Sequence, residues 1–231
     1  MADIEKADNG HHHDRYATAA TAGPAAAPTH LRTIANPAPL GLFSFASTTL
    51  MLSLFNVNVK GVTNANIVVG MAIACGGGAQ LLAGMWEFAC GNTFGATAFS
   101  SYGAFWISYA LIFIPGANIG VSYTGDVADQ EHNAVGVFLM VWFIVTFIFF
   151  IASLRSTMAL VALFFFLDIT FLLLMIGEFM NNVSIHKAGG GFGILTAFIA
   201  YYAGASALIT HDNSFVILPS GNMPKRRVSP A

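Results

Sequence analysis

Six apolar segments, each close to the length that crosses a lipid bilayer, constrain this chain more than any other feature. A helix needs about 20 apolar residues to span the hydrocarbon core, and in lipid it satisfies its own backbone hydrogen bonds. Charged residues make up only 9% of the chain, whereas soluble domains carry about 25%. The sequence therefore predicts an all-α, polytopic membrane protein, a bundle of six transmembrane helices in the lipid bilayer. The segments are residues 40–57, 67–88, 97–114, 134–154, 158–179 and 191–209.

Polar stretches flank this transmembrane domain, which we place at 36–210. Residues 1–35 are rich in Ala, Thr, Pro and charge, so we expect a disordered N-terminal tail, and 211–231 form a C-terminal tail. Positive charge predicts that both tails are cytoplasmic, because Lys and Arg accumulate on that side of a membrane. With the N-terminus inside, seven Lys and Arg face the cytoplasm, against Lys60 and Lys187 outside. The net charge of −2 provides no basic field for nucleic acid.

Three acidic residues fall within these segments or at their ends. Asp168 sits near the middle of 158–179, where a charge costs about 2.5–3.5 kcal/mol on insertion scales. It is either a proton-accepting carboxylate coupled to transport or a protonated, hydrogen-bonded structural acid. Glu87 and Glu178 lie near helix ends, where a solvated side chain is the favoured interpretation. Glu87 also precedes a polar turn at 91–95, so it is a candidate for the path of a solute or a proton.

Asn56, at the end of the first segment, and the hydroxyl side chains of Ser47, Thr48, Thr49 and Thr97 could line a polar path. Each hydroxyl could equally hydrogen-bond back to its own helix. The sequence contains no Gly-x-Ser-x-Gly turn, no phosphate-binding glycine loop with Lys and no metal-ligand spacing. We therefore expect no enzyme activity, no cofactor and no bound metal.

The first segment opens with the heptapeptide NPAPLGL, residues 36–42. Asn36 is suited to cap a helix because its side chain can accept from free amides of the first turn, and Pro37 is tolerated at the first helical position. The heptapeptide is either a rigid helix start or a helix N-terminus whose free amides and positive dipole end face an anion.

This heptapeptide, with Phe45 and the Thr48–Thr49 pair, resembles the signature of the acetate uptake transporter family, which includes bacterial succinate–acetate permeases and fungal Ato (ammonia transport outward) proteins. The resemblance continues in GNTFG at 91–95, TAFSSYGAFW at 97–106 and AYYAGA at 200–205. It implies a transporter or channel for acetate and similar small monocarboxylates in a fungal plasma membrane. It also implies a homo-oligomer, since relatives assemble as hexamers.

The resemblance further implies that Phe45, Tyr102 and Leu167 narrow the pore, with Phe166 as an adjacent alternative to Leu167. Apolar rings block hydrated ions by dewetting, whereas a neutral acid crosses an apolar gate more cheaply than its anion does. Tyr102 could offer its hydroxyl as a donor to a carboxylate. We therefore expect proton-linked uptake that acid pH favours.

Two other functions stay open. The first is conduction of ammonia or ammonium, which the name of the fungal relatives suggests. The predicted helices hold no central histidine for it, since His132 falls in a loop and His186 and His211 flank the last segment. The second is a membrane interaction or signalling protein that does not transport, in which the tails would bind partners.

Overall fold

The computed structural model describes residues 34–223 of the chain. Its long elements are all helices, and the β structure in this range is one isolated bridge between Thr157 and Asn222. The all-α prediction is therefore confirmed. The N-terminal tail predicted at 1–35 falls almost wholly outside the described residues.

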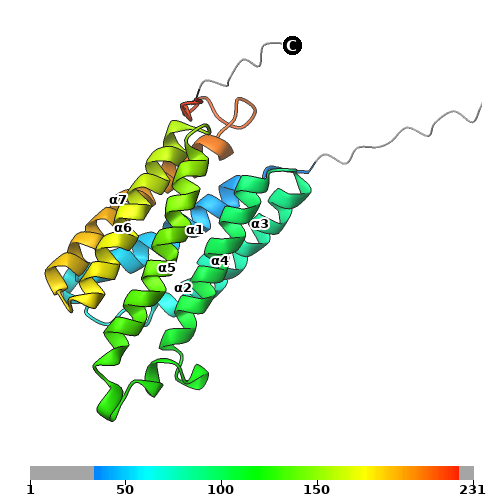
Figure 1. Cartoon of the computed structure of the whole chain (residues 1–231). Coiled ribbons are helices and arrows are strands. Elements are labelled where there is room, and N and C mark those ends of the chain that lie inside the picture. The colour runs from blue at the N-terminus through cyan, green and yellow to red at the C-terminus, as the bar shows by residue number, and fades with distance from the viewer. Residues whose placement is uncertain (1–33, 224–231) are drawn as a thin grey trace, which may run out of the picture. The chain divides into compact units, whose positions relative to one another are not determined.

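Among the described residues, six helical rods form the bundle (Figure 1). The second rod is a continuous run of two α-helices with a π-helical segment, η2, between them. The rods are α1 (Ala38–Asn56), α2 (Val68–Ile73) with η2 (Ala74–Ala79) and α3 (Gln80–Ala89), then α4 (Thr93–Phe113), α5 (Gln130–Ser153), α6 (Met158–Phe179) and α7 (Val183–Leu208). Short 3₁₀ turns lie in the connections: η1 (Val59–Gly61), η3 (Pro115–Ala117), η4 (Gly120–Ser122) and η5 (Gly125–Val127).

Five of these rods are long and apolar enough to cross a membrane. The exception is α4, in which residues such as Ser100, Ser101 and Tyr102 dilute the apolar ones. The chain is therefore a multi-pass membrane protein, and a membrane-spanning role for α4, the sixth predicted span, stays a prediction.

Asparagine caps start two helices earlier than the apolar pattern predicts. Helix α4 begins at Thr93 rather than at 97, because Asn92 Oδ1 accepts from the amide of Gly95 at 3.1 Å. Helix α7 begins at Val183 rather than at 191, because Asn182 Oδ1 accepts from two amides of the first turn. A count of apolar residues misses the polar first turns that such caps support.

Helix α1 begins at Ala38, one residue later than the heptapeptide predicts. The predicted capping contact is nevertheless present, since Asn36 Oδ1 accepts from the amide of Ala38 at 3.0 Å. Pro37 has helical backbone angles, so the two assignments differ only in where the helix is counted to start.

The rods pack side by side in a ring. Helix α3 packs on α4, α1 packs on η2 and α7, and α6 packs between α7 and α5. Aromatic side chains join α4 to α5, where the Phe105 ring centroid lies 5.0 Å from that of Trp142 and 5.7 Å from that of Phe138. The ring leaves the inner faces of α1, α4 and α6 turned toward a common interior.

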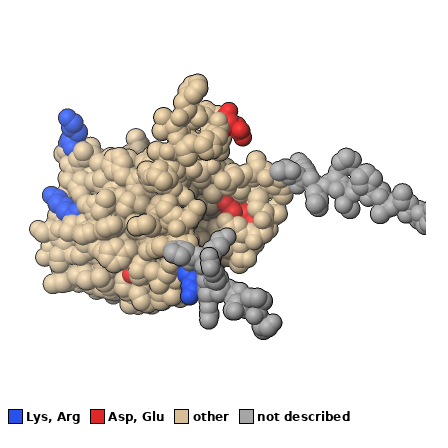
Figure 2. All heavy atoms as spheres, turned by 90° about the horizontal axis from the view of Figure 1, so that it is seen from above, with Lys and Arg blue, Asp and Glu red and all other residues tan. Residues whose placement is uncertain are grey.

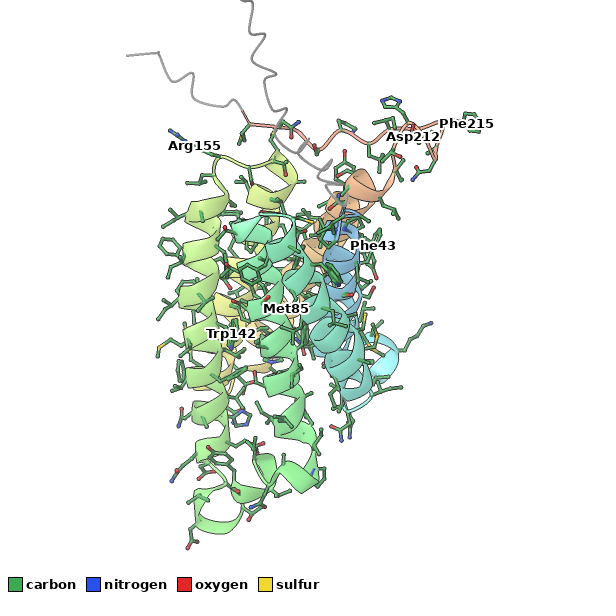
Figure 3. The ribbon with its side chains drawn as sticks, turned by 90° about the vertical axis from the view of Figure 1, so that its right-hand side faces the viewer. Phe43, Met85, Trp142, Arg155, Asp212 and Phe215 are labelled. Atoms are coloured by element: carbon green, nitrogen blue, oxygen red, sulfur yellow. The ribbon has the colours of Figure 1, made fainter. Side chains whose placement is uncertain are left out.

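The bundle has two distinct ends. Residues 34 and 223 lie at one of them, which we call the tail end, and the connection 114–129 lies at the other, the loop end (Figure 1). Arg155 and Asp212 are also at the tail end, as Figure 3 shows. Seen from that end, a few separate charged side chains stand out on a surface that is otherwise uncharged (Figure 2). Which end faces the cytoplasm stays a prediction.

Candidate functional site

Three cavities follow one another along the inner faces of α1, α4 and α6. The tail-end cavity has a volume of about 90 Å³, the middle cavity about 50 Å³ and the mouth cavity, at the loop end, about 500 Å³. The middle and mouth cavities share five lining residues, whereas Phe45 alone lines both the tail-end and the middle cavities. The middle and mouth cavities therefore adjoin along several residues, whereas the tail-end and middle cavities meet at Phe45.

Phe45 packs against Tyr102 at this point. Their ring centroids lie 5.6 Å apart in an edge-to-face arrangement, and the two side chains are only 4% and 3% exposed. Such aromatic pairs are favourable beyond the area they bury. The Phe45–Tyr102 contact thus brings together two of the residues that the resemblance implies for the pore, at the point where the tail-end and middle cavities meet.

The hydroxyl of Tyr102 is turned toward α5, where it lies 2.8 Å from Thr146 Oγ1. Thr146 donates its own proton to the carbonyl of Trp142 at 2.7 Å. Tyr102 must therefore donate to Thr146, because a hydroxyl has one proton to give. In this arrangement Tyr102 lines the tail-end cavity, and its proton is not free for a carboxylate as we expected.

Leu167 lines the middle cavity together with Phe45 and is 3% exposed. Its neighbour Phe166 stacks instead on Phe192 of α7, with ring centroids 6.2 Å apart. Phe166 is absent from the walls of the three cavities. Of the two residues left open by the sequence, Leu167 is the one that lines a cavity.

Glu87 and Gln80 are buried at the wall of the tail-end cavity, at 2% and 1% exposure. One carboxyl oxygen of Glu87 accepts from Asn92 Nδ2 at 2.7 Å, while its Oε1 and the Oε1 of Gln80 have no protein partner. The expectation of a solvated Glu87 is therefore wrong, because the turn after α3 folds Asn92 back over the carboxyl. Buried acceptors without partners are rare and require water or a ligand.

The predicted hydroxyl residues divide between the path and the helices. Thr49 lines the middle cavity, and its buried Oγ1 has no protein partner. Thr48 donates back to the carbonyl of Ser44 at 2.9 Å, and exposed Thr97 donates back to Thr93 at 2.8 Å. Of these three threonines, Thr49 is the one that lines a cavity.

Asn36 and Asp168 lie outside the three cavities. Asn36 is exposed next to Ala38, which does line the tail-end cavity. Asp168 is half-buried beside Leu167, and its Oδ1 has no protein partner. The structure therefore does not place Asp168 at the wall of these cavities.

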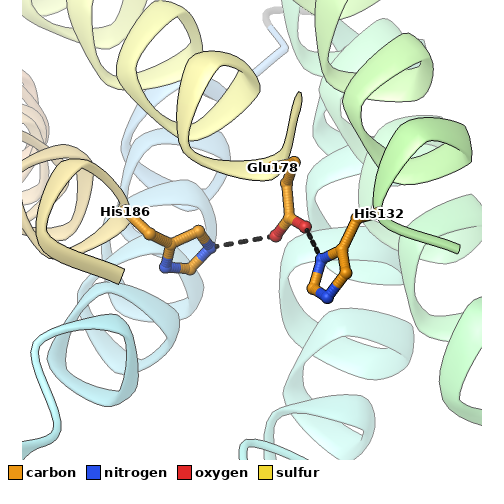
Figure 4. A network of polar contacts seen from close by, with 3 residues as sticks. All are labelled: His132, Glu178 and His186. Atoms are coloured by element: carbon orange, nitrogen blue, oxygen red, sulfur yellow. Dashed lines mark hydrogen bonds and ion pairs between the residues drawn. The ribbon is translucent and has the colours of Figure 1, made fainter. Parts of the chain in front are cut away.

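A polar cluster at the mouth was not predicted from the sequence. Glu178, in the last turn of α6, accepts from His132 Nδ1 at 2.7 Å and from His186 Nε2 at 3.2 Å (Figure 4). His132 belongs to the first turn of α5 rather than to a loop, and His186 to the first turn of α7. The sequence does contain one indication of this cluster. Glu178 and His186 lie on either side of a tight turn, which places them on facing ends of adjacent helices.

The whole bundle resembles proteins of known family. The chain matches the GPR1/FUN34/yaaH family over residues 18–225. Acetate permease A of Emericella nidulans is 48% identical over 202 residues, which cover 84% of this chain and 68% of that protein. Ammonia transport outward protein 2 of Saccharomyces cerevisiae is 43% identical over 204 residues, covering 88% of this chain and 72% of that protein.

Bacterial proteins extend the similarity. The succinate-acetate/proton symporter SatP of Escherichia coli is 35% identical over 189 residues, which cover 81% of this chain and 96% of that protein. The solved structure of the bacterial acetate channel SatP superposes with a TM-score of 0.70 at 33% sequence identity. It covers 81% of this chain and 100% of that one, so the two folds correspond over nearly the whole described bundle.

Proposed function

The chain belongs to the GPR1/FUN34/yaaH family, and from this premise we propose that it carries acetate and related small monocarboxylates across the membrane. The similar proteins named as an acetate permease and an acetate channel support this substrate class. We place the protein in the plasma membrane as a homo-oligomer, a hexamer by the family resemblance, with transport rather than catalysis as its activity.

The observation that carries the proposal is the aromatic contact between Phe45 and Tyr102, which separates two small cavities inside the bundle. A hydrated ion loses its water at such an apolar constriction, and this loss costs the full free energy of desolvation. A neutral acid of a few heavy atoms does not, and the tail-end cavity of about 90 Å³ has room for one. The constriction therefore favours small, uncharged acids.

Passage of the neutral acid links transport to protons. The acid takes up a proton on one side of Phe45 and releases it on the other, so a proton moves with each carboxylate. In the proposed orientation the mouth cavity opens to the outside and the tail end to the cytoplasm. Glu87 and Thr49 would then offer hydrogen-bonding groups on the two sides of the constriction.

Uptake of labelled acetate by the purified protein in liposomes tests the proposal. With the concentration gradient of acetate held fixed, an inward proton gradient should increase the initial rate over protein-free liposomes. The Phe45→Ala variant should change the rate of acetate uptake. The Phe165→Ala variant should not, because Phe165 is an exposed residue of α6. Rates that equal those of protein-free liposomes would reject the proposal.

Conduction of ammonia is the second candidate, because one similar protein is named for outward ammonia transport. The two functions separate in the same liposomes: labelled methylammonium should enter no faster than in protein-free liposomes if the substrate is a carboxylate. A third candidate, an interaction protein without transport, requires that removal of both tails abolish function, whereas a transporter core should retain acetate uptake.

A further inference from the structure

The walls of the mouth cavity are unusually rich in amide side chains. Asparagines come from α1, from the connection 57–67 and from the turn at 180–182, and no Lys or Arg within 34–223 lines this cavity. An amide carries two N–H donors, which suit a carboxylate, although Asn58 already donates from its Nδ2 to the carbonyl of Val62. The asparagines are Asn56, Asn58, Asn64, Asn66, Asn181 and Asn182.

The ionisable groups that face this cavity come from four helices. Tyr109 lies on α4, His132 on α5, Glu178 on α6 and His186 on α7, while α1 and the connection 57–67 contribute none. Glu178 holds the two imidazoles together from both of its oxygens. Imidazole is the side chain whose charge changes between about pH 5 and 8. The cluster of one carboxylate and two imidazoles therefore carries a formal charge of −1 when both imidazoles are neutral and +1 when both are protonated.

The cluster stands where the mouth cavity meets the middle cavity. Glu178 and His186 line both cavities, so a solute that enters from the mouth must pass them before it reaches Phe45. Close packing of α6 on α7 fixes this position. A Cβ at Gly177 would lie 2.9 Å from the backbone nitrogen of His186, so only glycine brings Glu178 this near to α7.

We propose that His132, Glu178 and His186, with the surrounding asparagine amides, form a docking site for the carboxylate of an anionic substrate when both imidazoles are protonated. The site rests on the proposed function, and it adds a recognition step that precedes the constriction. With both imidazoles protonated, the excess positive charge and the amide donors attract a carboxylate. With both imidazoles neutral, the unbalanced Glu178 carboxylate repels it.

The expected effect is moderate because the site is open to water. His132 has 52% of its side chain exposed, and exposed ion pairs contribute at most about 1 kcal/mol. That free energy corresponds to a change of about fivefold in affinity. Acid pH should therefore strengthen carboxylate binding about fivefold, on top of any effect of pH on the acid itself.

Binding of trifluoroacetate to the purified full-length protein in detergent tests the site, because this carboxylate stays ionised across the pH range and its fluorine signal can be followed by NMR. The parent protein should bind it about fivefold more tightly at pH 5.5 than at pH 7.5. The His132→Gln/His186→Gln variant keeps hydrogen-bonding groups but cannot titrate, so its affinity should be the same at both pH values.

His211→Gln is the matched control, since His211 lies beyond α7 at the tail end and outside the cavities. It should behave as the parent. If the double variant does not fold, the single variants His132→Gln and His186→Gln test the site instead. Each should lose about half of the increase in trifluoroacetate affinity that the parent shows at acid pH. Equal affinity of the parent at both pH values, or tightening that survives in the histidine variants, would overturn the docking site.

Acetate uptake measured with the same preparations distinguishes a failure of the docking site from a failure of the proposed function. A parent protein that transports acetate but binds trifluoroacetate without pH dependence rejects only the docking site. A parent protein that transports no acetate rejects the proposed function, even if the cluster binds the anion.

Discussion

The hydroxyl of Tyr102 on α4 lies 2.8 Å from the hydroxyl of Thr146 on α5, and Thr146 in turn donates to the carbonyl of Trp142. This relay ties the two helices together directly behind the Phe45 ring. It also turns the polar atom of Tyr102 away from the proposed path, so the constriction is formed by two aromatic rings. The contribution of Tyr102 to transport should therefore be steric rather than polar.

Tyr102→Phe should retain acetate uptake, because the ring stays in place. Thr146→Val should be the more damaging change, since it leaves the buried Tyr102 hydroxyl without an acceptor, at a cost of about 1–3 kcal/mol. Thermal unfolding in detergent should rank the parent above Tyr102→Phe and Tyr102→Phe above Thr146→Val. A complete loss of uptake in a folded Tyr102→Phe protein would show that the hydroxyl itself acts on the substrate.

Phe45→Ala should widen the constriction and relax the choice of substrate. A pocket that discriminates by size alone separates solutes that differ by one small group by roughly 10-fold or more. The ratio of acetate uptake to lactate uptake should therefore fall by about 10-fold in this variant. Phe165→Ala, which removes an exposed ring 45% open to the surroundings, should leave the ratio unchanged.

Gly177→Ala should push α6 away from α7, because the added Cβ would lie 2.9 Å from the His186 backbone nitrogen. Overpacking of this kind costs about 1–3 kcal/mol. Gly191→Ala is the control, since nothing lies within 4 Å of a Cβ there, and loss of glycine flexibility should stabilise it by about 0.4–1 kcal/mol. Equal melting temperatures for the two variants would contradict the close contact between α6 and α7.

Glu87→Gln should fold normally, because a glutamine oxygen can still accept from Asn92 Nδ2. Glu87→Leu should be less stable by about 1–3 kcal/mol, because the Asn92 amide is then left without an acceptor. If Glu87 takes part in proton movement, the glutamine variant should also lose the stimulation of acetate uptake by an inward proton gradient. Uptake with unchanged stimulation would limit Glu87 to a structural role.

Asp168→Asn should leave the pH dependence of acetate uptake unchanged, because Asp168 lies outside the cavities that form the path. The comparison is the initial rate at several external pH values, with the amount of protein matched to the parent. A flattened pH profile in this variant would restore Asp168 as a proton carrier and would place part of the path outside the three cavities.

Much of the candidate path could be predicted because its residues belong to recognisable motifs. Phe45 and Tyr102 lie in motifs of the family, and the structure places their rings in contact. Leu167 could not be separated from Phe166 by sequence, since adjacent residues on a helix differ in direction by about 100°. Only the packing of α6 between α5 and α7 decides which of the two faces inward.

The mouth cluster could not be predicted, because its three residues lie at the ends of three helices. From sequence alone, a histidine near a helix end is interpreted as a solvated residue. Its polar partner becomes apparent only when the position of the neighbouring helix is known. The caps at Asn92 and Asn182 were missed for a related reason: they begin helices in polar sequence, where an apolar count expects a loop.

By itself, the sequence determined that this protein is a helical membrane protein, because long apolar segments in lipid can satisfy their backbone only as helices. It also determined the family, through residues that lie close together along the chain. The tertiary structure decided which polar groups meet: Asp168 lies outside the three cavities, Glu87 is buried under Asn92, and Glu178 joins His132 to His186. Such pairings depend on how each helix is rotated about its axis and how closely it approaches its neighbours. Many contacts between residues far apart in the sequence determine both, so no local sequence pattern predicts them.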